Sequence, residues 1–235
     1  MAILNETLAD MPPHPYSPLG VSVPGYVVNS MSMPALVGAF AAGTSLMLLA
    51  TLSVAKMVRP SIGTGPLLAT MWFVVCGFIH FFFEGYFARN FMDMASQTDL
   101  FGQLWKEYSL SDSRYLTQDS FVVCMEAITA LFWGPLSFYC AYCILVDHPH
   151  RHPVQLIVSL GQLYGDVLYY ATCLFEHTVY GIFYCRPESF YFWAYFVFCN
   201  AFWIVIPLIL LWGSVKEMAA AAAKVKALEK ASKRK

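Results

Sequence analysis

Long apolar runs, separated by short polar connections, dominate this sequence. Five of the runs are each about 20 residues long, the length that crosses the hydrocarbon layer of a bilayer as a helix. They cover residues 34–55, 66–88, 120–146, 153–175 and 188–213. The fourth run is the least apolar because it contains Gln155, Gln162 and Asp166. The pattern predicts an all-α, polytopic membrane protein whose five transmembrane helices enclose an intramembrane pocket.

The composition agrees with a membrane protein. Of 235 residues, 58% are hydrophobic and only 12% are charged, whereas a soluble domain carries roughly 25% charged residues. The chain therefore has too few charges to cover a surface exposed to water. Its net charge of −1 provides no basic field for a polyanion, so we expect no nucleic-acid partner. The seven cysteines lie mostly in apolar runs and are predicted to be small buried side chains, not disulfides or metal ligands.

The remaining segments divide the chain into three parts. Residues 1–33 are expected to be an extended N-terminal segment, residues 34–215 the membrane domain, and residues 216–235 a basic, disordered tail that begins as a frayed helix. With five spans, ten of the 14 Lys and Arg residues fall on the side of the tail, which predicts a cytosolic C-terminus. The longest connection, 89–119, is polar with aromatic anchors and is predicted to form short interfacial helices over the mouth of the pocket.

Several polar side chains fall inside the predicted spans. An ionisable group at the centre of a bilayer costs at least a few kcal/mol, so its presence needs a reason. At about 1.5 Å per residue, five of these side chains lie in one band roughly 6–18 Å below one membrane surface: His80, Glu84, Glu126, Asp166 and Asn200. Thr129 and Trp203 lie three residues after Glu126 and Asn200, on the same helical faces.

The chemistry of these residues supports two interpretations. Asp166 and Asn200 are equally well explained as hydrogen-bonding contacts between helices. By contrast, His80 and Glu84 lie four residues apart on one helical face, and Glu126 falls at a similar depth. One imidazole and two carboxyl groups can exchange protons with a lipid-soluble substrate, and with aromatic walls they can stabilise a cation. Proton transfer on a sterol-like lipid and binding of cationic amphiphiles both fit.

Seven motifs make the chain resemble the emopamil-binding protein family, which comprises the sterol Δ8–Δ7 isomerases. The resemblance extends over roughly residues 66–212. The motifs are residues 73–87 (FVVCGFIHFFFEGYF), 103–108 (QLWKEY), 112–115 (DSRY), 123–130 (VCMEAITA), 133–137 (WGPLS), 161–169 (GQLYGDVLY) and 191–203 (YFWAYFVFCNAFW).

This resemblance implies a five-helix homodimer of the endoplasmic reticulum membrane, with no metal and no redox cofactor. The implied partners are a sterol substrate, cationic amphiphilic small molecules and membrane lipid. The implied reaction protonates C9 of a Δ8-sterol, gives a cation at C8, and removes a proton from C7. The implied functional residues are His80, Glu84, Glu126, Thr129, Asn200 and Trp203, with Arg114 and Tyr115 as further substrate-binding candidates. Asp166 is a substrate-binding candidate from its place inside the fourth run.

The roles we expect follow from the chemistry of each group. His80 and Glu84 shuttle the proton, while Glu126, with Asn200 and Thr129, orients that pair and balances its charge. Trp203 offers its ring face to the cation. Two other functions stay open: a non-catalytic sterol- or amine-binding membrane receptor and, less favoured because no internal repeat is visible, an ion-coupled transporter.

Overall fold

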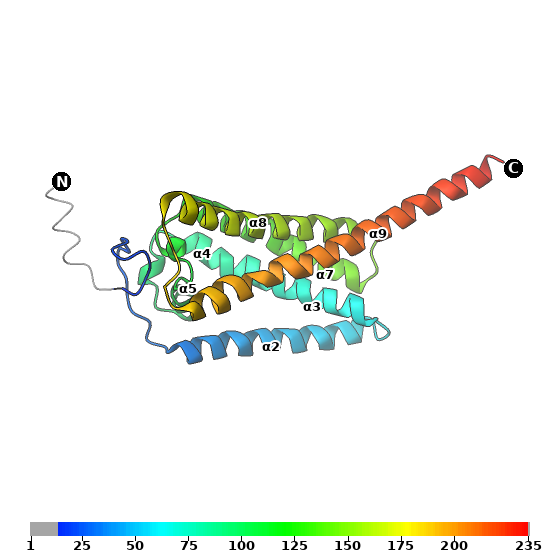
Figure 1. Cartoon of the computed structure of the whole chain (residues 1–235). Helices are drawn as coiled ribbons and strands as arrows, with labels where there is room; N and C mark the ends of the chain where they lie inside the picture. Colours follow the sequence, from blue (N-terminus) through cyan, green and yellow to red (C-terminus); the bar gives the residue numbers. More distant parts are fainter. Residues whose placement is uncertain (1–13, 235) are drawn as a thin grey trace.

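Five helical rods lie side by side in the computed structural model of the chain, which describes residues 14–234 (Figure 1). No strand occurs within that range. Two rods are single α-helices, α2 (Met33–Val58) and α8 (Arg151–Tyr180). The other three contain π-helical segments and are composed of α3 (Thr64–Phe78), η1 (Ile79–Glu84) and α4 (Gly85–Asn90); α6 (Ser120–Ile128), η4 (Thr129–Trp133) and α7 (Gly134–Leu145); and η5 (Tyr191–Cys199) and α9 (Asn200–Ser232).

The prediction of an all-helical, polytopic membrane protein is confirmed. Four stretches are long and apolar enough to cross a membrane: Met33–Val58, Thr64–Asn90, Ser120–Leu145 and Tyr191–Ser232. The helix α8 is long enough, at 30 residues, but it is not one of the four. The total of five spans therefore stays a prediction.

Local sequence signals mark the helix ends. Pro34 lies in the first turn of α2, where a missing N–H costs nothing. The Asp119 carboxylate accepts the Val122 N–H at 2.9 Å and so caps α6. Gly181 ends α8 with a φ of 68°, in the left-handed region that glycine adopts without strain.

Two glycines let neighbouring helices approach closely. A Cβ on Gly134 would lie 2.8 Å from the Cβ of Phe81, which brings the third rod against η1. A Cβ on Gly161 would lie 2.5 Å from the Trp133 ring, which brings α8 against η4. Small residues allow such contacts in membranes, where helices associate through packing. Gly165, by contrast, has no neighbouring atom within 4 Å of that position.

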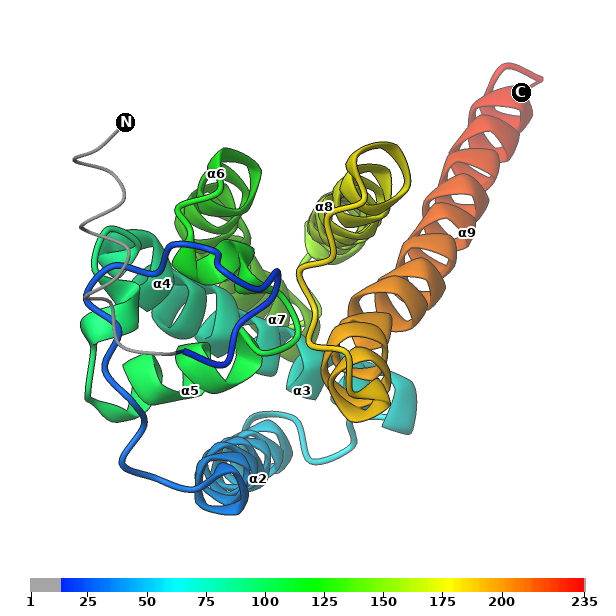
Figure 2. The same cartoon turned by 60° about the vertical axis from the view of Figure 1, so that its left-hand side comes forward.

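A polar cap, made of residues 14–32, 91–119 and 181–190, covers one end of the bundle (Figures 1 and 2). It contains the short helices predicted for the long connection: η2 (Met94–Ser96), α5 (Leu100–Tyr108) and η3 (Ser113–Leu116). The N-terminal segment is not loose where it is described, because the Tyr16 hydroxyl donates to the Lys106 carbonyl at 3.1 Å and the Lys106 ammonium donates to the Val27 carbonyl at 2.6 Å. Residues 1–13 lie outside the described residues.

The C-terminal tail differs from our expectation. Instead of becoming disordered, α9 continues to Ser232 and projects beyond the bundle (Figure 1). Its residues 219–223 are all alanine and are followed by lysines and Glu229, which are strong helix formers. Every residue from 215 to 234 is exposed, so propensity alone maintains this helix.

The cysteines are free thiols, as predicted. Five are buried, including Cys185, which the sequence places in a polar stretch. Cys124 differs from the prediction because it is exposed on the outside of α6. A face that contacts lipid does not need to be covered by protein, and this explains the exception.

Candidate functional site

His80 lies at the meeting point of three helical rods. It belongs to η1 and is only 2% exposed. Its Nδ1 lies 2.9 Å and 2.8 Å from the two carboxyl oxygens of Glu84, one turn further along. Its Nε2 lies 2.9 Å from Nε2 of Gln162 on α8 and 3.5 Å from the indole nitrogen of Trp203 on α9. The imidazole is therefore held on both nitrogens inside the bundle.

A fourth element brings in the second carboxyl group. Glu126, on α6, is 5% exposed. It interacts electrostatically with both Glu84 and His80, so the three groups form one cluster. The Tyr115 hydroxyl, from the cap, donates to its Oε1 at 2.7 Å. Tyr115 lies before the span begins, and burial, followed by the nearby Glu126 carboxyl group, raises its pKa well above the usual value. It therefore stays protonated and donates.

Each π-helical segment contains or adjoins a predicted site residue. His80 and Glu84 both belong to η1, Thr129 begins η4, and Asn200 directly follows η5. A π turn closes through an i→i+5 hydrogen bond and is uncommon outside functional sites. In η1 the Phe83 carbonyl accepts from the Trp105 indole at 3.0 Å, and the two rings stack 4.5 Å apart. The cap thus holds the widened turn that carries the imidazole.

Within the described range, three other predicted residues make their hydrogen bonds outside the cluster or have none. The Asn200 amide donates to the Tyr108 hydroxyl at 2.9 Å and to the Phe196 carbonyl at 2.7 Å. The Thr129 hydroxyl donates to the Met125 carbonyl of its own helix at 2.8 Å. Asp166 is 9% exposed, and its Oδ2 has no hydrogen-bonding partner among the described residues.

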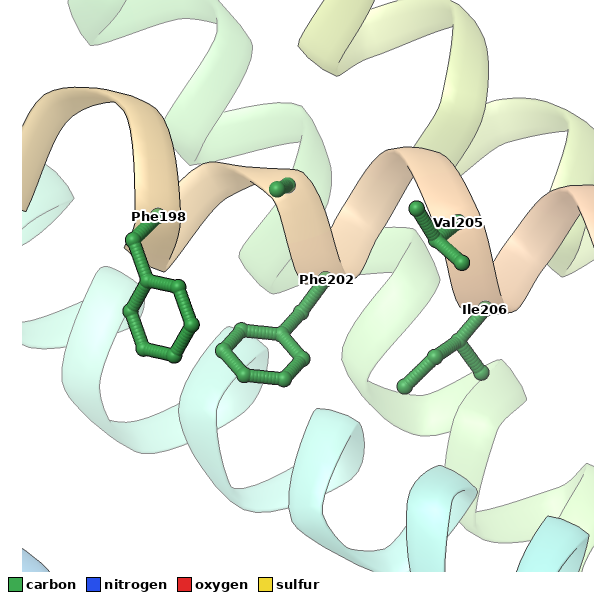
Figure 3. A pocket seen from close by; sticks show the side chains of 5 residues that line it. Phe198, Phe202, Val205 and Ile206 are labelled. Carbon is green, nitrogen blue, oxygen red and sulfur yellow. The ribbon is translucent and has the colours of Figure 1, made fainter. Parts of the chain in front are cut away.

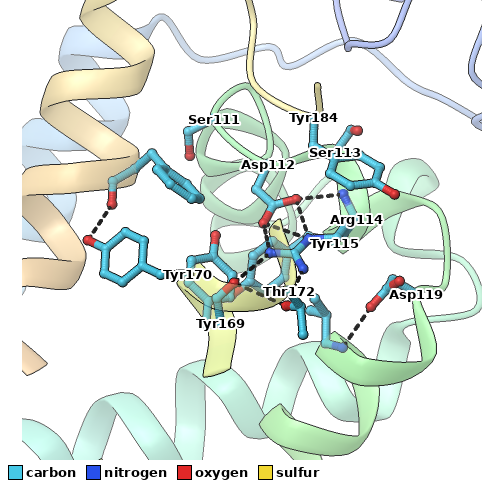
Figure 4. Close-up of polar contacts among 12 residues, drawn as sticks. Ser111, Asp112, Ser113, Arg114, Tyr115, Asp119, Tyr169, Tyr170, Thr172 and Tyr184 are labelled. Atoms are coloured by element: carbon cyan, nitrogen blue, oxygen red, sulfur yellow. Dashed lines mark hydrogen bonds and ion pairs between the residues drawn. The ribbon is translucent and has the colours of Figure 1, made fainter. Parts of the chain in front are cut away.

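Arg114 lies in a buried ion pair with Asp112 (Figure 4). Its guanidinium binds both oxygens of Asp112, at 2.7–3.0 Å, and donates to the Thr172 hydroxyl at 2.9 Å. Burial opposes its charge, but the Asp112 carboxylate outweighs that effect and raises the pKa of Arg114. Arg114 is only 1% exposed, and its bond to Thr172 fixes η3 to α8. The next residue, Tyr115, is thereby directed at Glu126.

Two apolar hollows lie on the outside of the bundle. One, of about 250 Å³, is lined by Phe198, Ala201, Phe202, Val205 and Ile206 of η5 and α9 (Figure 3). The other, of about 500 Å³, lies between α2 and α3 and includes Met47 and Phe78. No cluster residue lines either hollow. The first hollow lies on the stretch of chain that also carries Asn200 and Trp203.

The sequence did not single out three partners of the cluster. The sequence marks Gln162 only as one of the residues that make the fourth run the least apolar, although an intramembrane amide is itself a signal. The sequence indicates that Trp105 and Tyr108 are aromatic anchors of the long connection. It gives no sign that they contact η1 and Asn200, because both lie outside the predicted spans.

These features define a polytopic membrane protein with a buried cluster of one histidine and two carboxyl groups. Residues 100–214 match the family EXPERA (EXPanded EBP superfamily). The chain is 42% identical over 216 residues to the 3-beta-hydroxysteroid-Delta(8),Delta(7)-isomerase of Mus musculus, covering 92% of this chain and 93% of that protein. The proteins of the same name from Rattus norvegicus and Cavia porcellus are 41% and 38% identical, over 88% and 90% of this chain and 90% and 91% of theirs. The chain therefore belongs to the emopamil-binding protein family.

Proposed function

We propose that this protein is a sterol isomerase that moves the ring double bond of a 3β-hydroxysteroid from Δ8 to Δ7. The names of its relatives support this assignment. The observation that carries it is the buried contact of 2.8 Å between His80 and Glu84, beside Glu126. Such a set can give a proton and take one without water, which is what moving a double bond requires.

The proposed reaction consists of two proton transfers. The π electrons of the C8=C9 bond form a new C9–H bond with a proton from the cluster, which leaves a cation at C8. The C7–H bond then breaks, its electrons form the C7=C8 bond, and the cluster takes the proton. One proton is added and one is removed, and no electrons are gained or lost, so the reaction needs no redox cofactor. The expected shuttle between His80 and Glu84, with Glu126 balancing charge, is part of the proposal.

The cation at C8 needs surroundings that are negative or rich in π electrons but not nucleophilic. The Trp203 ring centre lies 6.1 Å from the imidazole and 5.5 Å from the Trp72 ring centre, which places two indoles beside the cluster. Aromatic faces attract cations, and the attraction is stronger without water. For the same reason, we propose that protonated amines on an apolar body bind here as well.

A sterol would reach this site from the bilayer. The hollow on α9 is apolar and is lined by Phe198 and Phe202, whose rings point towards the neighbouring rod in Figure 3. It offers a place for the sterol skeleton next to the helix that carries Trp203. Further parts of the proposal, based on the family resemblance and the lysine-rich end of α9, are an endoplasmic reticulum location, a cytosolic C-terminus and a homodimer.

The experiment gives a Δ8-sterol to membranes that contain the protein and no other isomerase. The wild type is expected to form Δ7 product, and Glu126→Gln is expected to lose at least about 10²-fold of that rate. Glu217→Gln is the control, because Glu217 is exposed on the projecting part of α9. Binding of the sterol by the wild type without conversion would overturn the proposal and favour a receptor.

A further inference from the structure

We infer that Gln162 is a positioning residue that fixes the tautomer of His80, with the proton on Nδ1 facing Glu84 and the lone pair on Nε2. The inference rests on the proposed function and adds to it a residue of α8. The geometry is that of two donors converging on one imidazole nitrogen, while the other nitrogen faces a carboxyl group.

Trp203 decides the direction of these hydrogen bonds. An indole nitrogen can only donate, and it lies 3.5 Å from Nε2 of His80. The amide nitrogen of Gln162 approaches the same atom at 2.9 Å. With two donors directed at it, Nε2 must present a lone pair. In a neutral imidazole the hydrogen is then on Nδ1, where both oxygens of Glu84 lie within 2.9 Å.

This arrangement has a chemical consequence for Glu84. When its carboxylate accepts the Nδ1–H of His80, Glu84 is held in one orientation as a proton acceptor. The imidazole cannot reach the substrate through Nε2, because Gln162 and Trp203 occupy that side. The opposite tautomer would place a lone pair against the carboxylate and an N–H against the indole, which is unfavourable on both sides. Gln162 and Trp203 therefore keep Glu84 ready to take the proton that leaves C7, the second of the two proposed transfers.

The side chain of Gln162 suits this role, and its amide group also hydrogen-bonds the buried Cys76 thiol. It is 4% exposed, and its Oε1 has no hydrogen-bonding partner among the described residues. The amide nitrogen is therefore the end of Gln162 that the bundle uses. A second glutamine, Gln155, lies on the same face of α8, two turns away. It is also 4% exposed, but its amide donates to the Leu210 carbonyl at 3.0 Å.

The pair Gln162→Leu and Gln155→Leu tests the inference, since each variant removes one equally buried amide from α8. We expect Gln162→Leu to lower kcat about 10- to 100-fold with little change in KM, as losses of groups that orient a functional side chain do. We expect Gln155→Leu to keep kcat. Gln162→Asn, which keeps an amide but shortens its reach by one methylene, is the second variant and is expected to behave as Gln162→Leu does.

A spectroscopic measurement separates this inference from the proposed reaction. Nitrogen-15 NMR of histidine-labelled protein in detergent, with the His80 signal assigned by its loss in His80→Ala, reports which ring nitrogen carries hydrogen. The wild type and Gln155→Leu are expected to show the Nδ1–H form, and Gln162→Leu a mixture of tautomers. A wild-type imidazole protonated on Nε2, or a Gln162→Leu protein with unchanged tautomer and kcat, would overturn the inference. A fixed tautomer in a protein without isomerase activity would leave the geometry in place and refute only the function.

Discussion

Tyr115 and Glu126 are joined by a hydrogen bond of 2.7 Å that links the polar cap to the cluster inside the membrane. The donor lies before the span begins, in η3, and the acceptor lies two turns into α6–η4–α7. The cap is therefore part of the site and not merely a cover over it.

Removing this hydroxyl is expected to impair the chemistry. A hydrogen bond to a charged group contributes about 1.5–3 kcal/mol, so Tyr115→Phe should lower kcat for the Δ8-sterol about 10- to 100-fold. Tyr16→Phe is the control, because its hydroxyl is also buried in the cap but donates to the Lys106 carbonyl. Equal activity of the two variants would show that the bond to Glu126 has no catalytic importance.

The Arg114–Asp112 pair is expected to matter for stability. Removing one partner of a buried ion pair leaves the other charge uncompensated and costs about 3–5 kcal/mol. Arg114→Met should therefore lower the Tm in detergent far more than Arg186→Met, since the partner of Arg186 is the surface residue Glu188. A surface pair contributes only about 0–1 kcal/mol. Similar Tm values for both variants would contradict the structural role of Arg114.

A methyl group at Gly134 should disturb the site through packing. Its Cβ would meet both the Cβ of Phe81 and, at 2.9 Å, the backbone nitrogen of that residue in η1. We expect Gly134→Ala to lower Tm and kcat together, because the turn that carries His80 has to shift. Gly165→Ala places the same methyl in open space and should be neutral or stabilising by up to about 1 kcal/mol, from helix propensity. A neutral Gly134→Ala would mean that the two rods do not pack this closely.

Asp99 should make the stability of the cap depend on pH. Burial is the largest single effect and opposes its charge, but the hydrogen bonds from the Tyr86 hydroxyl and from the N–H groups of Gly102 and Phe101 together outweigh it and lower the pKa of Asp99 below its usual 3.8. A carboxyl group whose pKa is lower in the folded state stabilises the fold above its unfolded pKa, and the contribution is lost as pH falls.

Asp99→Asn keeps the cap of α5 but not the charge, so its Tm should fall less steeply than that of the wild type below about pH 4. Asp99→Ala should cost about 1 kcal/mol at neutral pH, because the N-terminal turn of α5 loses its acceptor. Parallel Tm curves for Asp99→Asn and the wild type would be evidence against a charged cap.

The sequence predicts the rods and the polar residues between them, because a polar residue inside a long apolar run can be recognised by counting along the chain. His80, Glu84 and Glu126 were placed at one depth by counting residues, and the structure brings them together. Trp203, which lies one turn beyond Asn200 on another rod, contacts the same imidazole.

The partners of the remaining residues could not be read in this way. Whether Asn200 faces His80 or Tyr108 depends on the rotation of η5, and no residue pattern signals a π turn. The long-range contact of Arg114 with Thr172 depends on how the cap folds back onto α8, which is a tertiary effect. Asp112, two residues before Arg114, was the available signal of an ion pair.

The π turn between Ile79 and Glu84 accommodates one residue more than an α-helical turn would. Deleting a single phenylalanine from the run of residues 81–83 would let this segment relax to ordinary α-helix. The side chains before and after the segment would then keep their orientation, because the extra residue of the π turn is the one removed. The change would instead fall on the pair itself, since His80 and Glu84 would be three residues apart and no longer four, and the 2.8 Å contact between them would have to form with a different geometry.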